Sequence, residues 1–234
     1  MVIDADADAD VATAADERRH LVGSSPWWGE TWGFDVADAA HDMAAFVELT
    51  VHPRRRTCWF VAAVRRAGHP YVLCRDQDLG PPADPLEVRG TALWSHLICE
   101  KWFEHWTVAM EAFAVALDPP SDAWHGERGD RVGLAFDLEW ESAVLPSLHR
   151  DGAVSGYELQ CTVHGTMQVG DDALNIAGTG RRTHRWGALD PDWLQATSPA
   201  DASPDGPTWP WSIHLEDGLL RLSHAPERDL HAGA

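Results

Sequence analysis

The side chains best suited to chemistry in this chain are histidines and carboxylates set among many tryptophans. The 234 residues include thirteen Trp but only two Tyr. Thirteen indoles exceed what one ordinary core of this size requires, so we expect some of them to line a cavity. In a dry pocket a Trp face can stabilise a cation by about 0.5–2 kcal/mol, and a carboxylic acid whose pKa is raised by burial can donate a proton. This combination suits the hydration of an alkene or the proton-initiated closure of a polyene.

His184 and Trp186 are the first candidates for such a site. Only one residue separates them, so on an extended strand the imidazole and the indole point to the same face. A structural histidine bonded to a backbone carbonyl is an equally good interpretation of His184. The other candidate catalytic residues, as proton donors or orienting groups, are His164, Glu104 and Asp137.

Ordinary interpretations compete with these three candidates and are favoured over them. His164 can be a buried structural histidine, Glu104 can belong to ordinary packing and surface, and Asp137 can lie on a solvated strand face with Glu139 and Glu141. The candidate substrate-binding residues are five tryptophans and one glutamine: Trp32, Trp59, Trp106, Trp140, Trp211 and Gln160.

Several classes of site lack their sequence signatures. The sequence has no phosphate loop, nucleophile elbow or HExxH motif, which disfavours nucleotide-binding, serine-hydrolase and zinc-protease functions. Gly178 and Gly180 are followed by Arg and His rather than by a helix start, so they do not form a dinucleotide site. The four cysteines show none of the paired spacings of zinc sites. We therefore expect no cofactor and no metal.

The charge balance limits the choice of partner. Lys plus Arg number 18 against 37 for Asp plus Glu, a formal charge of -19, so nucleic acid or an anionic membrane would be repelled. The expected partner is a small hydrophobic molecule. Alternating Asp and Ala predict that residues 1–22 form a disordered tail. No apolar stretch approaches the about 20 residues of a membrane span, and no basic signal-peptide region is present, so the predicted location is the cytoplasm.

Short β-branched and aromatic segments between Gly and Pro clusters predict strands through most of the chain. Met43–His52, Cys58–Val64 and Tyr71–Arg75 are predicted to form a meander. Further strands are expected within 86–97, 102–117, 132–140, 157–169, 211–215 and 219–223, although the composition of 102–117 also suits a helix. About eight strands can enclose a ligand, so a mostly-β barrel or sandwich is predicted.

A set of motifs spread over residues 27–190 resembles a known superfamily. These motifs are Glu30-Thr31-Trp32-Gly33-Phe34, Cys99-Glu100 with Glu104-His105-Trp106, Asp137-Leu138-Glu139-Trp140, Gln160 with His164-Gly165, and Gly178-Thr179-Gly180-Arg181-Arg182-Thr183-His184-Arg185-Trp186-Gly187. Together they resemble the carotenoid 1,2-hydratase-like superfamily, also called hydroxyneurosporene synthase-like or AttH-like. The last motif is similar to its Arg-Asp-His-x-Trp-Gly signature, with Thr183 in place of Asp.

The resemblance implies a lipocalin-like β domain over residues 23–190 and a truncated second lipocalin-like part over 191–234. In the hydratases the His-x-Trp pair is one half of a site completed by a Tyr and an Asp, whereas this chain reads Trp209-Pro210-Trp211-Ser212-Ile213-His214 at that distance. This departure disfavours carotenoid hydration itself. It favours cyclisation, because the superfamily also includes pericyclases that need only to orient a polyene.

Three functions remain open at this stage. The first is an enzyme that cyclises, hydrates or isomerises an isoprenoid or polyketide polyene in a Trp-lined barrel. The second is a non-catalytic carrier of a small hydrophobic ligand. The third is an assembly partner whose exposed sheet edge pairs with another copy, giving a homodimer.

Overall fold

The described part of the chain is built from β-strands. The computed structural model describes residues 11–83, 86–118 and 129–189, together with the backbone of strands 211–216 and 219–224. The strands are β1 (Trp28–Asp38), β2 (Met43–His52), β3 (Thr57–Arg66), β4 (Tyr71–Leu79), β5 (Glu87–Arg89), β6 (Leu93–Lys101), β7 (His105–Leu117), β8 (Asp130–Glu141), β9 (His149–Asp151), β10 (Val154–Val169), β11 (Asp172–Ala188), β12 (Trp211–Glu216) and β13 (Leu219–His224).

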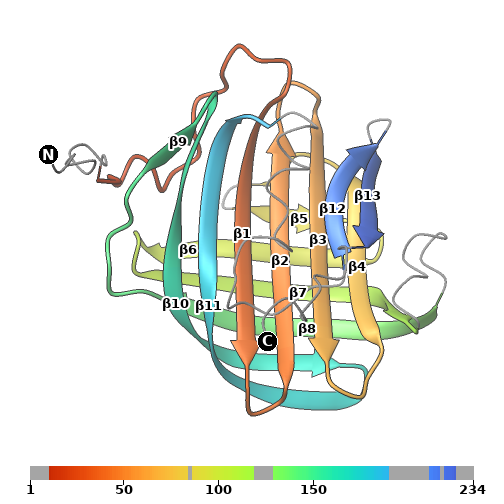
Figure 1. Ribbon diagram of the computed structural model, residues 1–234. Helices are drawn as coiled ribbons and strands as arrows, with labels where there is room; N and C mark the ends of the chain where they lie inside the picture. Colours follow the sequence, from red (N-terminus) through yellow and green to blue (C-terminus); the bar gives the residue numbers. More distant parts are fainter. Residues whose placement is uncertain (1–10, 84–85, 119–128, 190–210, 217–218, 225–234) are drawn as a thin grey trace, which may run out of the picture.

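One antiparallel sheet closes on itself to form a lipocalin-like barrel. Its strands follow the order β4-β3-β2-β1-β11-β10-β8-β7, and a further pairing of β4 with β7 completes the ring. In Figure 1 strands β1 to β4, β10 and β11 form one layer, and β6, β7 and β8 cross behind it. Strands β5 and β6 extend the sheet beyond β7, and β9 pairs with β10. Strands β12 and β13 form a separate two-stranded sheet.

Alternation along the strands produces the barrel interior. On β1, Trp32, Phe34 and Val36 face inward, and each is at most 2% exposed. The strand register places inward-facing residues side by side on neighbouring strands. Trp32 lies opposite Leu49 on β2 and opposite His184 on β11. The indoles of Trp106 and Trp140 come from β7 and β8 and contact the ring of Phe34, with centroids 5.6 and 5.2 Å away. Burial of this apolar area is the main term that stabilises the barrel.

Most of the predicted strands are present. β2 occupies Met43–His52 as predicted, and the meander of β2, β3 and β4 is confirmed by its pairings. The region 86–97 contains β5 and the start of β6. The ambiguous segment 102–117 is strand from His105 onward, because its alternate side chains Trp106, Val108 and Met110 belong to the barrel core.

The outer face of β2, β3 and β4 carries a second, smaller apolar cluster. Trp59 packs there with Phe46, Val61 and Leu73, on the opposite side of the sheet from Phe60. The four cysteines are all free, and Cys58, Cys74 and Cys161 are buried. Burial raises the pKa of Cys58 to about 12, which keeps it a thiol.

The segment before β1 contacts the barrel. Val11 forms a bridge with Ser147, Ala12 joins the core, and the side chain of Glu17 is buried. The sequence pattern placed these residues in a disordered tail over 1–22, of which residues 1–10 lie outside the described part. The alternating Asp-Ala pattern ends before Glu17, and the side chains of Glu17, Arg18 and His20 contact Arg182, Trp102 and Glu30.

The large sheet spans Trp28–Ala188, inside the predicted domain of residues 23–190, and β12 and β13 fall within 191–234. The described residues include no helix with the length and apolar character that a membrane crossing requires.

Candidate functional site

Three barrel strands and the N-terminal segment bring a polar cluster into the interior. β11 supplies His184 and Trp186, β1 supplies Glu30, and β10 supplies Tyr157 opposite His184. His20 reaches the same place from the N-terminal segment. Glu30 and His184 are polar residues on an apolar face, and both are at most 2% exposed.

The Glu30 carboxylate joins the two histidines. Its Oε1 accepts hydrogen bonds from Nδ1 of His20 and from Nε2 of His184, each at 2.9 Å. The backbone N–H of His20 donates to the same carboxylate at 3.1 Å. Burial alone would raise the pKa of Glu30, but the hydrogen bonds from His184 and His20 outweigh it and the pKa is lowered. Glu30 is therefore ionised at neutral pH.

His184 is a neutral imidazole with one unused nitrogen. Burial lowers its pKa from 6.5, and this effect exceeds the opposing hydrogen bond and charge of Glu30. Since the ionised Glu30 can only accept, Nε2 of His184 must carry the proton. Nδ1 is then a bare acceptor, and it is buried with no hydrogen-bond partner among the described residues. A buried polar atom without a partner is costly, so it marks a place where a ligand or proton could bind.

Aromatic rings surround this imidazole. Trp32 stacks on it with centroids 4.9 Å apart, and Tyr157 meets it edge-on at 5.6 Å. Trp186 lies 5.1 Å away and stacks in turn on His20 at 3.7 Å. Because the His20 side chain is 18% exposed, it connects the buried pair to solvent.

A second buried network adjoins the first. Arg182, one inward position before His184, donates to the hydroxyl of Tyr157 at 2.9 Å and forms an ion pair with Glu17 at 3.0 Å. Glu17 also accepts from the indole N–H of Trp106 at 2.8 Å and from the backbone N–H of Phe103 at 2.9 Å. The N-terminal segment is thus bonded inside the barrel beside the Glu30 cluster.

The structure brings together only part of the predicted catalytic set. His184 and Trp186 share the inner face of β11. Glu104 is exposed and pairs with Lys101, Asp137 is exposed on β8, and the side chain of His164 is 47% exposed on the outer face of β10. Inward positions on β8 and β10 are taken by Leu138 and Val163, and period-two alternation therefore turns Asp137 and His164 outward. Glu104 lies in the turn between β6 and β7.

The predicted substrate-binding residues also divide by face. Trp32, Trp106 and Trp140 are in the barrel core. Trp59 is in the outer cluster instead, and Gln160 is exposed on β10. The side chain of Trp211 lies outside the described residues.

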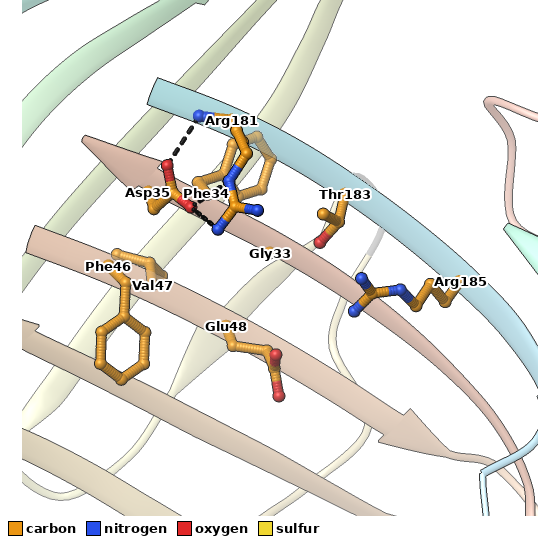
Figure 2. Close-up of a pocket in the computed structure, with 9 residues that line it drawn as sticks. All are labelled: Gly33, Phe34, Asp35, Phe46, Val47, Glu48, Arg181, Thr183 and Arg185. Atoms are coloured by element: carbon orange, nitrogen blue, oxygen red, sulfur yellow. Dashed lines mark hydrogen bonds and ion pairs between the residues drawn. The ribbon is translucent and has the colours of Figure 1, made fainter. Parts of the chain in front are cut away.

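The outer face of β1, β2 and β11 carries a second group of polar side chains. The hollow between these side chains is too small to hold a substrate. Figure 2 shows Asp35 bonded to Arg181, with Glu48 and Arg185 beside them. The hollow between them is about 30 Å3, room for about one water. Thr183, at the position where the resembling signature has Asp, lines this outer pocket and not the His184 site.

Sequence reasoning did not select five residues that complete the interior site: Glu17, His20, Glu30, Tyr157 and Arg182. Glu30 could have been found as a lone carboxylate in phase with Trp32 and Phe34 on a strand. For His20 and Glu17 the sequence offers one indication of order, which is that the Asp-Ala alternation ends before them. Nothing in a single sequence pairs them with β11.

Two groups of described residues have the donor types and spacing for a metal ion. His20, Glu30 and His184 form the first, and their ligand atoms lie within 4.8 Å of one another. A metal there would displace the hydrogen bonds that already satisfy Glu30. The second group, His105, Glu139 and Glu141, lies on the outer face of the barrel.

Comparison with known proteins places the chain in a family. None of the curated proteins matches it. A solved structure described as a candidate AttH from Nitrosomonas europaea is similar over 92% of this chain and 73% of its own, with 11% identity and a TM-score of 0.43. The family model described as "Domain of unknown function (DUF7064)" matches residues 13–218. The chain therefore belongs to the DUF7064 family.

Proposed function

We propose that this protein is an enzyme that binds an apolar polyene, of isoprenoid or polyketide type, inside the barrel and shifts its double bonds or closes it into a ring by proton transfer. His184 is the general base and Glu30 orients it. The observation that carries the proposal is the buried, unpartnered Nδ1 of His184, with an ionised carboxylate bonded to Nε2 on the other side of the ring.

In this arrangement a carboxylate, Glu30, orients the imidazole of His184 so that its other ring nitrogen can act as a base. Nδ1 takes a proton from a carbon acidified by a conjugated carbonyl, and the imidazolium that forms is stabilised by Glu30 at 2.9 Å. Return of a proton from Nδ1 to another carbon of the conjugated system, after exchange with solvent or without it, completes an isomerisation without any cofactor. The faces of Trp32 and Trp186 provide apolar, polarisable walls for the polyene.

In this proposal the ligand takes the space that the N-terminal segment now occupies inside the barrel. Ala12 and Glu17 occupy interior positions, and Glu17 contacts Trp106 and Arg182. Withdrawal of this segment would open the barrel beside Trp186 and His184. A polyene entering there would bring its polar end toward Nδ1 and its chain toward the indoles.

The test uses two activated polyenes, farnesal and a sorboyl thioester, incubated with the full chain in D2O. Mass spectrometry of the recovered compound measures deuterium at carbon, and chromatography measures rearranged product. We expect wild-type protein to catalyse exchange and rearrangement. His184→Gln and Glu30→Gln should each slow both by about 100-fold or more. Glu104→Gln, an exposed carboxylate, is the matched control and should leave both rates unchanged.

Two other outcomes separate the alternatives. Quenching of Trp fluorescence by a ligand that is recovered unaltered would replace the enzyme with a carrier. Ring closure that proceeds equally fast in His184→Gln would indicate a pericyclic reaction, which needs orientation but no base. Thermal melts of each variant establish that the barrel is folded in every comparison.

A further inference from the structure

A second group of potential ligands lies on the outer face of the barrel, away from the interior site. His105 starts β7, Glu139 and Glu141 end β8, and His164 lies on β10. These three strands are hydrogen-bonded neighbours, so the four side chains share one surface. Their side chains are 30–50% exposed, which leaves them accessible to an ion from solvent.

The register arranges these residues as two opposed pairs. His105 lies opposite Glu141 across β7 and β8, and Glu139 lies opposite His164 across β8 and β10. The closest contacts run along the diagonals. Nε2 of His105 is 2.9 Å from Oε2 of Glu139, and Nε2 of His164 is 3.6 Å from Oε2 of Glu141. Both carboxylates therefore turn toward the middle of the group.

Ligand atoms of three of these residues are already close enough for one ion. One atom each from His105, Glu139 and Glu141 lies within 4.8 Å of the others. Zinc bonds of about 2.0–2.2 Å to N and O place neighbouring ligand atoms about 3.3 Å apart in a tetrahedron. Rotation of exposed side chains suffices to reach that spacing.

A hollow of about 700 Å3 opens beside the group. His105 and Glu141 line it together with the polar side chains Gln160, Thr162 and Thr179. An ion held by the three residues would face this hollow with its remaining coordination position. Three protein ligands with one open position are the arrangement of zinc sites that bind water or a further ligand.

Charge also favours a cation at this place. Glu139 and Glu141 are two carboxylates on the same face of one strand, so they repel each other when both are ionised. The contacts of His105 and His164 offset only part of this repulsion, because all four side chains are partly exposed and screened by solvent. The chain as a whole carries a formal charge of -19, which raises the local concentration of cations.

We propose that His105, Glu139 and Glu141 form a binding site for a divalent transition metal, Zn2+ in the first instance, with His164 flanking Glu141. One His nitrogen and two carboxylate oxygens on adjacent strands give the borderline donor set that zinc accepts. The site is independent of the proposed chemistry at His184.

The experiment is calorimetric titration of the full chain with ZnCl2. Wild-type protein should bind one ion at a site whose affinity falls at least tenfold, about 1.4 kcal/mol, in His105→Ala and in the double variant Glu139→Gln with Glu141→Gln. Glu111→Gln is the matched control, because it removes a carboxylate from the same outer face of β7 and should leave the affinity unchanged. His184→Gln should also leave it unchanged.

Two results would overturn the proposal. One is zinc affinity that is unchanged in both ligand variants. The other is affinity lost in His184→Gln, because zinc would then be bound by the interior group. The outward position of these side chains keeps the variants folded, and a thermal melt in the absence of zinc checks this.

Discussion

His184 has the chemistry of a base because of what surrounds it. Burial lowers its pKa, Glu30 fixes which nitrogen carries the proton, and Nδ1 is buried with no hydrogen-bond partner among the described residues. Removal of the Glu30 charge would leave an imidazole that has lost the group contributing most to the stability of its protonated form. The pair therefore acts as a unit, in the sense that loss of either member removes most of its effect.

The pH dependence of the proposed reaction follows from this pKa. Because burial holds the pKa of His184 below 6.5, its imidazole remains a free base at pH 6.5, where an exposed histidine would be half protonated. The rate of proton exchange should be constant from neutral pH down past 6.5 and fall only at lower pH. A rate that already falls by half at or above pH 6.5 would contradict the assignment.

His52 gives a second residue-level prediction, for stability. It is fully buried against Trp59, and burial, with the charge of Arg55, lowers its pKa to about 4. In the unfolded chain its pKa is 6.5, so the unfolded state binds the proton more readily below that value. The free energy of unfolding should therefore fall by about 3 kcal/mol as the pH decreases from 6.5 toward 4.

Urea unfolding at several pH values measures this loss. His52→Gln should flatten the dependence between pH 6.5 and 4, and His69→Gln, an exposed histidine, should not. An unchanged slope in His52→Gln would show that other groups cause the acid sensitivity.

Glu17 links the N-terminal segment to the barrel through a buried ion pair. Removal of one partner of such a pair leaves an uncompensated charge, here on Arg182, and costs about 3–5 kcal/mol. Glu17→Ala should lower the free energy of unfolding by that amount and speed ligand uptake, measured by stopped-flow quenching of Trp fluorescence with farnesal. Thr13→Ala is the control, because its exposed side chain is in the same segment and bonds to Asp16 rather than to the barrel. Slower uptake in Glu17→Ala would exclude the segment as the entry point.

Among the elements, β11 carries two glycines in its middle, Gly178 and Gly180, where it lies against β1. A Cβ at Gly180 would lie 1.9 Å from the carbonyl oxygen of Asp35 on β1, and a Cβ at Gly178 would lie 2.2 Å from that of Ala37. The two strands approach closely just before Arg182 and His184. The Gly-rich start of the motif therefore sets the position of the site and binds no ligand.

Gly180→Ala should consequently destabilise the barrel, because backbone atoms must shift to admit the methyl group. We expect a loss of about 3 kcal/mol or more, at the upper end of overpacking effects. Gly133→Ala on β8 is the matched control, since its Cβ would meet no atom within 4 Å, and it should be neutral or slightly stabilising. Equal melting temperatures for the two variants would contradict the close approach of β1 and β11.

The strands were largely predictable from the sequence and the site was not. β8 and β10 alternate clearly, and β2 is an apolar run with β-branched residues next to a turn, so these patterns were enough to find them. β1 and β11 combine charged, aromatic and Gly residues, and their extent emerges only from their mutual pairing. Glu30 and His20 meet His184 through strand register and the path of the N-terminal segment, and neither is encoded in local pattern.

At the scale of the molecule, ring closure determines which residues can act together. The pairing of β1 with β11 joins the first and last barrel strands, which brings Glu30 and His184 into contact across 154 positions of sequence. The closed barrel separates this buried inner site from an outer surface where Glu104, Asp137 and His164 meet solvent. We propose one buried base inside and one metal site outside.

The most direct test of the central claim is the protonation state of His184, read from its two ring nitrogens by 15N NMR of the full chain, with His184→Gln to assign the signals. We predict a neutral ring at neutral pH, with the proton on Nε2, a bare Nδ1 and a titration midpoint below 6.5. A ring that carries its proton on Nδ1, or an imidazolium at neutral pH, would contradict the account.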